Sequence, residues 1–389
     1  MSVLITFLKA VLNALRDVLA DPGARSTMVA AIFIYSLLYP QPYVGELVRD
    51  VPVVAIDQDN STASRAFLRN LDASDRVEIV QSVATMEAAR AVFYQRDAYG
   101  IVLIPQDFEQ DLLSNRPAPV AAFGDGSYLL IYSNLMSAVS GVARNLGAQV
   151  NYNRLTARGV DDGQARALIA PVTVTSIPVF NPSGGYAAYI VPAAFVLILQ
   201  QTLLMGIGLL HAGRPLPKGV NLVATPVAYV ALYTLWTLFT QLFLPFAYDI
   251  PRTGDIATLM MVSLPFLCAS TAMGFAVAIA IPWREGVVFF LVVLGLPLFF
   301  LSGISWPVES IPAPLHLLAL LVPSSSAIPA IVAVDQMGAQ ARDVAGTIEL
   351  QLALTVGYTL LAVLLAWLTR HRHHAAADDG VTQHPKTQA

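Results

Sequence analysis

Charged residues and cysteine are both scarce in this sequence. Of the 389 residues, 12% are charged, about half of the ~25% that is usual in globular proteins, whereas 56% are hydrophobic. This is too little charge to cover the surface of a soluble protein of this length. The single cysteine, Cys268, excludes an internal disulfide framework and a cysteine-ligated metal cluster. The net charge is −4, so the chain has no excess of Lys and Arg with which to bind phosphates, and we expect no nucleic-acid partner.

The few charges are unevenly distributed along the chain. They are dense between Glu46 and Arg166 and nearly vanish between Gly185 and Trp367. A helix needs roughly 20 apolar residues to cross a bilayer. Six stretches qualify, at residues 26–44, 186–210, 222–248, 256–281, 287–304 and 347–369. The sequence therefore predicts an α-helical integral membrane protein with six transmembrane helices, the first at 26–45 and the others in a bundle at 186–370.

Lysine and arginine in the short connecting segments predict the orientation of these helices. In a six-helix arrangement, one side carries Lys9, Arg16, Arg25, Arg214, Lys218, Arg284, Arg370 and Arg372. The opposite short loops are mainly acidic. Since cytoplasmic loops are enriched in Lys and Arg, we expect the first side, and with it both termini, to be cytoplasmic.

Both ends of the chain and one loop depart from simple spans. Residues 1–25 have apolar residues at helical spacing, interrupted by charges, which indicates an amphipathic helix on the cytoplasmic leaflet; a frayed start of the first span is the alternative. Residues 305–343 contain a short apolar piece between prolines, which predicts a re-entrant or interfacial hairpin on the outer side. Residues 371–389 begin with His-rich sequence, for which a disordered cytoplasmic tail is favoured over a metal-binding tail.

The polar segment at 46–185 has the length of an ordinary domain, about 140 residues. Strand signals at 51–56, 77–80, 98–104 and 120–123 alternate with helix signals at 61–71, 85–96, 108–114 and 128–158, and a last strand is expected at 171–180. This alternation predicts an α/β domain inserted between the first and second transmembrane helices, outside the membrane. Asp57 and its neighbours Asp59 and Asn60 indicate a strand-to-helix turn rather than a calcium loop, because six to eight oxygen ligands are missing. No catalytic or metal site is expected.

Several polar residues lie within the expected spans, and none of them is charged. Those that we single out are Gln200, Gln201, Thr202 and Gln241. Hydrogen bonds between helices are the favoured explanation, and a translocation path is the alternative. The chain has no Gly-Lys pair and hence no phosphate-binding loop of the Walker type, so any energy for transport must come from another subunit.

Four separated segments resemble one known family. They read VPVVAIDQDNSTASRAFLRNLDAS, GIVLIPQDFEQDLL, FNPSGGYAAYIVPAAFVLILQQTLLMGIGLL and PLFFLSGISWPVESIP. Their order and their place in the six-helix arrangement are similar to those of type-2 ABC transporter permeases, in particular the bacterial drug-exporter-like branch with a large periplasmic domain. The similarity extends over most of residues 1–370.

The resemblance implies a permease subunit of an ATP-driven exporter in the bacterial inner membrane. It would move an amphiphilic substrate or drug outward, as a homodimer or with a second permease. ATP would be bound by a separate ATPase subunit, so that this chain itself would bind no cofactor. A periplasmic membrane-fusion protein and an outer-membrane channel would be further partners.

One departure from the family concerns contact with the ATPase. The loop after the second span, His211–Gly219, is short, whereas many family members carry a longer charged stretch there. Coupling is therefore expected to depend more on the N-terminal amphipathic helix and on the loop Trp283–Gly286, with Arg284 and Glu285 as its charged pair. Arg214 and Lys218 are the further coupling candidates. An alternative function remains open, that of a non-transporting membrane scaffold or receptor-like protein whose outer domain binds an envelope or secretion partner.

Overall fold

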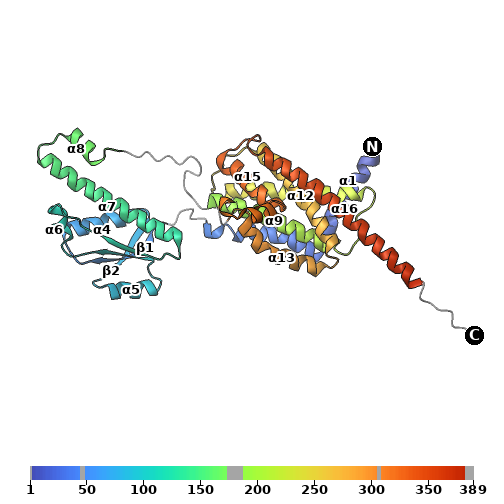
Figure 1. Cartoon of the computed structure of the whole chain (residues 1–389), viewed down its shortest axis with the longest axis horizontal. Coiled ribbons are helices and arrows are strands. Elements are labelled where there is room, and N and C mark those ends of the chain that lie inside the picture. Colours follow the sequence, from blue (N-terminus) through green and yellow to red (C-terminus); the bar gives the residue numbers. More distant parts are fainter. Residues whose placement is uncertain (1, 44–48, 173–186, 305–307, 382–389) are drawn as a thin grey trace, which may run out of the picture. The chain divides into compact units, whose positions relative to one another are not determined.

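The computed structural model describes residues 2–43, 49–172, 187–304 and 308–381 (Figure 1). The chain divides into two compact units, which are described separately. The first, called the helical unit below, comprises Met1–Glu46 together with Pro178–Ala389. The second, called the sheet unit, comprises Leu47–Ile177. The last strand expected from the sequence, at 171–180, falls almost entirely outside the described residues.

The helical unit contains long apolar helices joined by short loops. Its elements are α1 (Ser2–Ala20), α2 (Pro22–Arg25), η1 (Ser26–Ala30), α3 (Ala31–Leu38), η2 (Gln41–Tyr43), α9 (Ala187–His211), α10 (Asn221–Leu238), η3 (Phe239–Phe243), α11 (Leu244–Ala247), α12 (Ile256–Ala280), α13 (Arg284–Leu301), η4 (Val308–Ser310), α14 (Ala313–Ala319), α15 (Pro323–Met337) and α16 (Ala345–Val381). Of these, η1 and η3 are single π-turns within continuous helices, and η2 and η4 are 3₁₀ turns.

Five or six of these helical segments could cross a membrane. Five are long and apolar enough by themselves: α9, α10 with η3 and α11, α12, α13, and residues 345–369 of α16. The pair α14 and α15 is bent by 91° at its break, and it is either a sixth, broken span or a re-entrant loop of the kind expected from the sequence for residues 305–343. The first span expected from the sequence is helical from Pro22 to Leu38, which is shorter than the roughly 20 residues of a full crossing. A multi-pass membrane protein is confirmed, whereas the number of six crossings stays a prediction.

The C-terminal end of the helical unit differs from the sequence-based expectation. The helix α16 continues to Val381, so that residues 371–381 of the tail expected to be disordered are helical. Ala and Arg are strong helix formers, and a helix that is already formed extends without a new nucleation step. At the other end, α1 buries Ala10, Ala14 and Val18 and packs against α10, while an adjacent stripe of leucines, including Leu4 and Leu8, is exposed.

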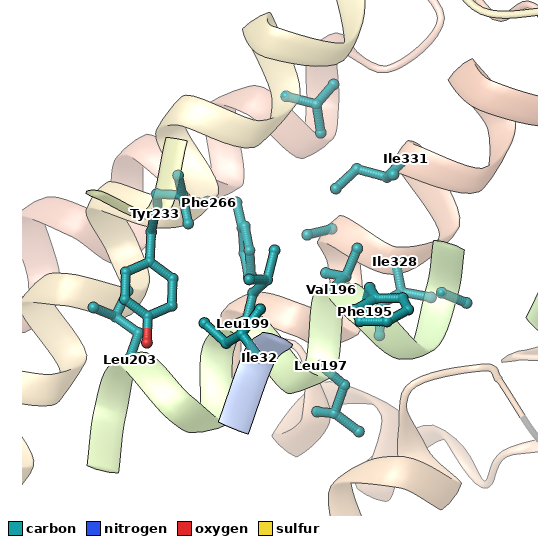
Figure 2. Close-up of a cluster of buried hydrophobic side chains, with 14 of the residues drawn as sticks. Ile32, Phe195, Val196, Leu197, Leu199, Leu203, Tyr233, Phe266, Ile328 and Ile331 are labelled. Carbon is teal, nitrogen blue, oxygen red and sulfur yellow. The ribbon is translucent and has the colours of Figure 1, made fainter. Parts of the chain in front are cut away.

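The centre of the helical unit is α9. Its sequence is apolar on every side, and residues from all around it are buried, as is expected of a helix with no polar face. Figure 2 shows Phe195, Leu199 and Leu203 of α9 among side chains from α3, α10, α12 and α15. Pro192 lies inside this helix without ending it, as do Pro226, Pro265 and Pro297 in theirs. Membrane helices tolerate such prolines when neighbouring groups satisfy the freed carbonyls.

Glycines allow neighbouring helices to approach α9 closely. A Cβ at Gly208 would lie 2.3 Å from Cγ1 and 2.9 Å from Cβ of Val287 in α13. A Cβ at Gly206 would lie 2.2 Å from Cγ of Met28. A Cβ at Gly274 of α12 would lie 2.7 Å from Cδ1 of Ile207. Small residues at such positions are typical of helix packing in membranes, where close contact replaces the hydrophobic effect.

The sheet unit is a four-stranded mixed sheet covered by helices on both faces (Figure 1). Its elements are β1 (Val51–Asp57), α4 (Thr62–Asp72), β2 (Val77–Ser82), α5 (Met86–Tyr94), β3 (Gly100–Ile104), α6 (Phe108–Leu113), β4 (Ala121–Gly124), α7 (Leu129–Ala157) and α8 (Asp162–Ile169). The strand order is β2-β1-β3-β4, with β1 parallel to both neighbours and β4 antiparallel to β3. Helices α4, α6 and α7 share a core with one face, and α5 covers the other.

Side-chain caps define where the helices of the sheet unit begin. Ser61 caps α4 and forms a capping box with Ser64, and Thr85 caps α5. Asp57 accepts hydrogen bonds from the N–H groups of Asp59 and Asn60 and from the hydroxyl of Ser64. Its oxygens are therefore occupied by the turn, as expected for an Asx turn. No group of three or more His, Cys, Asp and Glu in the described part of the chain could hold a metal ion.

The close approach at Gly208 generates a prediction. Gly208→Ala should lower the thermal unfolding midpoint of the purified chain in detergent, because Val287 is β-branched and cannot swing away; overpacking of this kind costs about 1–3 kcal/mol. Gly357→Ala is the matched control, since Gly357 is helical and has open space at its Cβ position. Adding Val287→Ala should restore the midpoint of the Gly208 variant. An unchanged midpoint in Gly208→Ala would contradict this packing.

The turn at Asp57 generates a second prediction. Asp57→Ala leaves two backbone donors and one hydroxyl without their acceptor, which should destabilise the sheet unit by about 1–3 kcal/mol. Limited proteolysis of the full chain should then cut the sheet unit faster than in the parent protein. Asp97→Ala, which removes an exposed carboxylate without a hydrogen bond in the described residues, should leave the cleavage rate unchanged. Equal rates for both variants would show that the turn does not depend on Asp57.

Candidate functional site

Three segments far apart in sequence meet at one end of the helical unit. They are the junction of α1 and α2, the loop between α9 and α10, and the loop between α12 and α13. A Cβ at Gly23 would lie 3.4 Å from Cδ1 of Leu209, and one at Gly213 would lie 2.5 Å from the carbonyl oxygen of Pro282. This end carries all four residues expected to couple the chain to an ATPase.

An ion pair links two of these segments. Nη2 of Arg284 donates to Oδ2 of Asp21 at 2.7 Å, while Oδ1 of Asp21 accepts the N–H of Ala24 at 2.9 Å. Asp21 thus caps α2, which begins with Pro22, and Arg284 is the first residue of α13. The N–H of Ala24 and the Arg284 guanidinium hold the pKa of the Asp21 carboxyl below its usual value. The pair is only partly exposed, with 39% of the Arg284 and 18% of the Asp21 side chain accessible.

The other coupling candidates lie nearby without fixed partners. Glu285 is exposed in the first turn of α13, where a negative charge suits the helix dipole. Arg214 and Lys218 are exposed in the loop between α9 and α10, and neither side chain makes an ion pair with a described residue. Sequence reasoning missed Asp21, although Asp followed by Pro is a strong signal for the start of a helix.

Three of the four polar residues singled out within the spans make hydrogen bonds between helices. Oε1 of Gln200 accepts the N–H of Ser324 at the start of α15, at 2.7 Å. Thr202 accepts from the hydroxyl of Tyr233 in α10, at 3.1 Å. Nε2 of Gln241 donates to the carbonyl oxygen of Pro192, at 3.0 Å. Each bond fixes α9 against a neighbour.

Gln201 is different from the other three. Its two amide atoms are buried and have no hydrogen-bond partner in the described part of the chain. It faces α13, because a Cβ at Gly295 would lie 3.7 Å from Nε2 of Gln201. A buried amide without partners costs free energy, and such groups in native proteins call for an explanation such as a bound molecule or a second conformation.

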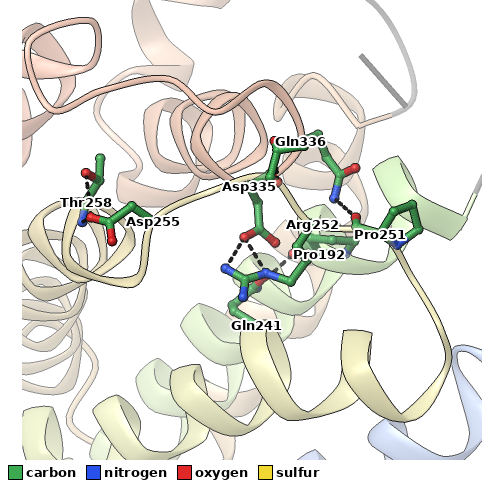
Figure 3. A network of polar contacts seen from close by, with 9 residues as sticks. Pro192, Gln241, Pro251, Arg252, Asp255, Thr258, Asp335 and Gln336 are labelled. Carbon is green, nitrogen blue, oxygen red and sulfur yellow. Dashed lines mark hydrogen bonds and ion pairs between the residues drawn. The ribbon is translucent and has the colours of Figure 1, made fainter. Parts of the chain in front are cut away.

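The opposite end of the helical unit is closed by a second ion pair. Nε of Arg252 donates to Oδ1 of the fully buried Asp335 at 2.7 Å (Figure 3). Nε2 of Gln336 donates to the carbonyl oxygen of Pro251, and the N–H of Thr253 to that of Asp335. A Cβ at Gly254 would lie 2.4 Å from the carbonyl oxygen of Val334, so only glycine fits there. The loop between α11 and α12 is therefore fastened to the end of α15.

In the sheet unit, Asp125 has a structural contact rather than a reactive one. Its carboxylate accepts the N–H of Ser127 and lies 2.6 Å from Nη1 of Arg96. These two contacts hold the pKa of Asp125 below its usual value. The carboxylate is thus engaged in the turn that follows β4.

Two known proteins and one family model are similar to this chain. Residues 26–212 match the model described as ABC-2 family transporter protein. The "Probable multidrug ABC transporter permease YbhS" of Escherichia coli strain K12 is 22% identical over 386 residues, which covers 92% of this chain and 94% of the relative. The protein of the same name from Escherichia coli O157:H7 is similar to the same extent.

The two kinds of similarity agree with the structure. The family match extends from the first helical segment through the sheet unit to the end of α9, and the relative is similar over nearly its whole length. Permeases of this family are membrane components without a catalytic site of their own, and the family implies an ATPase partner and dimerisation. The resemblance seen in the sequence motifs is thus confirmed, because both similarities support a type-2 ABC transporter permease.

Proposed function

We propose that this chain is the permease subunit of an ATP-driven exporter in the bacterial inner membrane. Two permeases, identical or paralogous, work with separate ATPase subunits that bind the ATP. Six crossings place both termini in the cytoplasm and the sheet unit, inserted between the first and second spans, in the periplasm. There it is available to a membrane-fusion protein that continues to an outer-membrane channel.

The observation that carries the proposal is the Asp21–Arg284 pair. It joins the junction of α1 and α2 to the first residue of α13, at the end of the helical unit that bears Arg214 and Lys218. A push from an ATPase on these segments moves α13 as a whole, because Arg284 and Gly295 belong to one helix. Gly295 lies beside Gln201, roughly 16 Å along that helix from Arg284 at 1.5 Å per residue.

The substrate is an amphiphile. The spans offer amide and hydroxyl groups but no charged side chain within the apolar windows of α9 and α12. Both amide atoms of Gln201, and the hydroxyls of Ser263 and Ser270, have no partner in the described residues. Export driven by ATP needs no proton relay in the membrane, whereas transporters coupled to ions usually have intramembrane ionisable residues. Movement of α13 relative to α9 would give the Gln201 amide access to a polar group of the substrate.

Coupling gives the functional test. In proteoliposomes with the cognate ATPase, Arg284→Ala and Asp21→Ala should each lower substrate-stimulated ATP hydrolysis by at least about five-fold, the lower end of a typical coupling free energy. The double reversal Asp21→Arg with Arg284→Asp should recover part of it, because the ion pair is re-formed. Co-purification of the ATPase checks that assembly is intact.

The control for this test is Arg342→Ala, which removes an exposed arginine in the loop between α15 and α16. Glu285→Ala examines the second charge of the α12–α13 loop separately. Unchanged stimulation in both Arg284→Ala and Asp21→Ala would remove the pair from the mechanism. A chain that co-purifies with a secretion component and with no ATPase would instead favour the scaffold function.

Orientation gives another test. In a Cys268→Ala background, Asp97→Cys in the sheet unit and Lys218→Cys in the α9–α10 loop introduce single exposed thiols. A membrane-impermeant maleimide should label Asp97→Cys in intact spheroplasts and Lys218→Cys only in inside-out vesicles. The background protein without cysteine should stay unlabelled. Labelling of both positions from the same side would contradict the proposed topology.

A further inference from the structure

A deep groove lies on the helical unit between α10, α12 and α16, away from Gln201. Its volume is about 760 Å³, within the roughly 300–1,000 Å³ of small-molecule sites. Each of the three helices contributes to its wall, with Val227 and Val230 from α10, Cys268 and Ala272 from α12, and Thr359 and Ala362 from α16. Helix α12 forms its floor, because it packs against both α10 and α16.

The wall of this groove is apolar even where it contains threonine. The hydroxyls of Thr234, Thr271, Thr355 and Thr359 each donate to the carbonyl oxygen four residues earlier in the same helix, at 2.7–2.8 Å. Since the hydroxyls are satisfied by the backbone, the groove offers no free donor at these positions. An alkyl chain fits such a surface better than a polar ligand does.

One end of the groove is cationic. Leu216 lines both the groove and a second pocket of about 240 Å³, which includes Arg214, Pro282 and Thr369. Arg214 and Lys218 flank Leu216 in sequence, and both are exposed. Neither side chain has an ion-pair or hydrogen-bond partner in the described part of the chain. No acidic residue lines the groove or the second pocket.

We propose that this groove is a binding site for one anionic phospholipid of the surrounding leaflet. One acyl chain lies between α10, α12 and α16, and the phosphate lies at Arg214 with Lys218 beside it. Basic residues next to a span favour anionic lipids. Because Leu216 lines both the groove and the pocket with Arg214, one lipid can place its acyl chain in the groove and its phosphate at Arg214. The site concerns a resident lipid, so it does not depend on the proposed export function.

Native mass spectrometry of the purified full-length chain tests the site. With phosphatidylglycerol and phosphatidylethanolamine of equal chain length, one phosphatidylglycerol should be retained in preference. Arg214→Gln with Lys218→Gln should reduce this preference roughly ten-fold or more, on the scale that two basic residues contribute near an anionic lipid. Ala272→Phe, which fills the middle of the groove, should reduce retention of both lipids.

Matched controls separate the site from general effects. Arg342→Gln removes an exposed arginine outside both pockets, and Val292→Phe enlarges an exposed apolar side chain of α13 outside the groove. Both should retain phosphatidylglycerol like the parent. If Ala272→Phe does not fold, Ala231→Phe fills the groove from α10, where Ala231 is exposed.

Four results would overturn the proposal. Three of them are equal retention of the two lipids by the parent protein, full retention by a folded groove-filling variant, and unchanged preference after loss of both cations. Displacement of the lipid by a transported amphiphile at the same concentration would also overturn it, because the groove would then be a substrate site.

Discussion

The structure of the helical unit depends on the burial of α9 on all sides. Inside a bilayer there is no hydrophobic driving force between helices, so a central helix needs close van der Waals contact and hydrogen bonds that lipid cannot offer. Gly206 and Gly208 provide the contact, and Gln200, Thr202 and Gln241 take part in the hydrogen bonds. Every other span is placed by its contact with α9 or with α12 beside it.

The two ends of the unit are fastened in different ways. At one end, the buried Asp335 pairs with Arg252. Backbone hydrogen bonds and the close approach of Gly254, where no Cβ would fit, hold the same loop in place. At the other end, Asp21 and Arg284 form a single pair that is accessible to water. A partly exposed pair exchanges partners more readily than one within a buried network, because water replaces what is lost. The second end is thus the one suited to receive a moving partner.

Sequence reasoning identified the spans well because hydrophobic length is a property of each segment alone. The bounds of α9, α12, α4, α5 and α7 follow from apolar runs, capping residues and prolines, whereas α8 was not expected from the sequence. Ion pairs between residues far apart in the sequence could not be predicted. Nothing in the sequence relates Asp21 to Arg284, or Arg252 to Asp335. For Gln200, Gln201, Thr202 and Gln241 the sequence offered the same two explanations, hydrogen bonds between helices or a translocation path, whereas the structure separates Gln201 from the rest.

The helical unit has two contrasting sides. The unpaired Gln201 amide faces α13, whereas the proposed lipid groove lies between α10, α12 and α16. On the side of α10 and α16, hydroxyls are satisfied within their own helices, so a lipid chain can stay there without exposing a polar group. On the side of α13, an amide is buried at a cost of about 1–3 kcal/mol when it has no partner. In the proposed mechanism, that cost is recovered when α13 moves and a polar group of the substrate enters. Arg284 is the first residue of α13. In the proposed mechanism, a change at the Asp21–Arg284 pair therefore acts on the side of the unpaired Gln201 amide, while the lipid groove between α10, α12 and α16 stays unchanged.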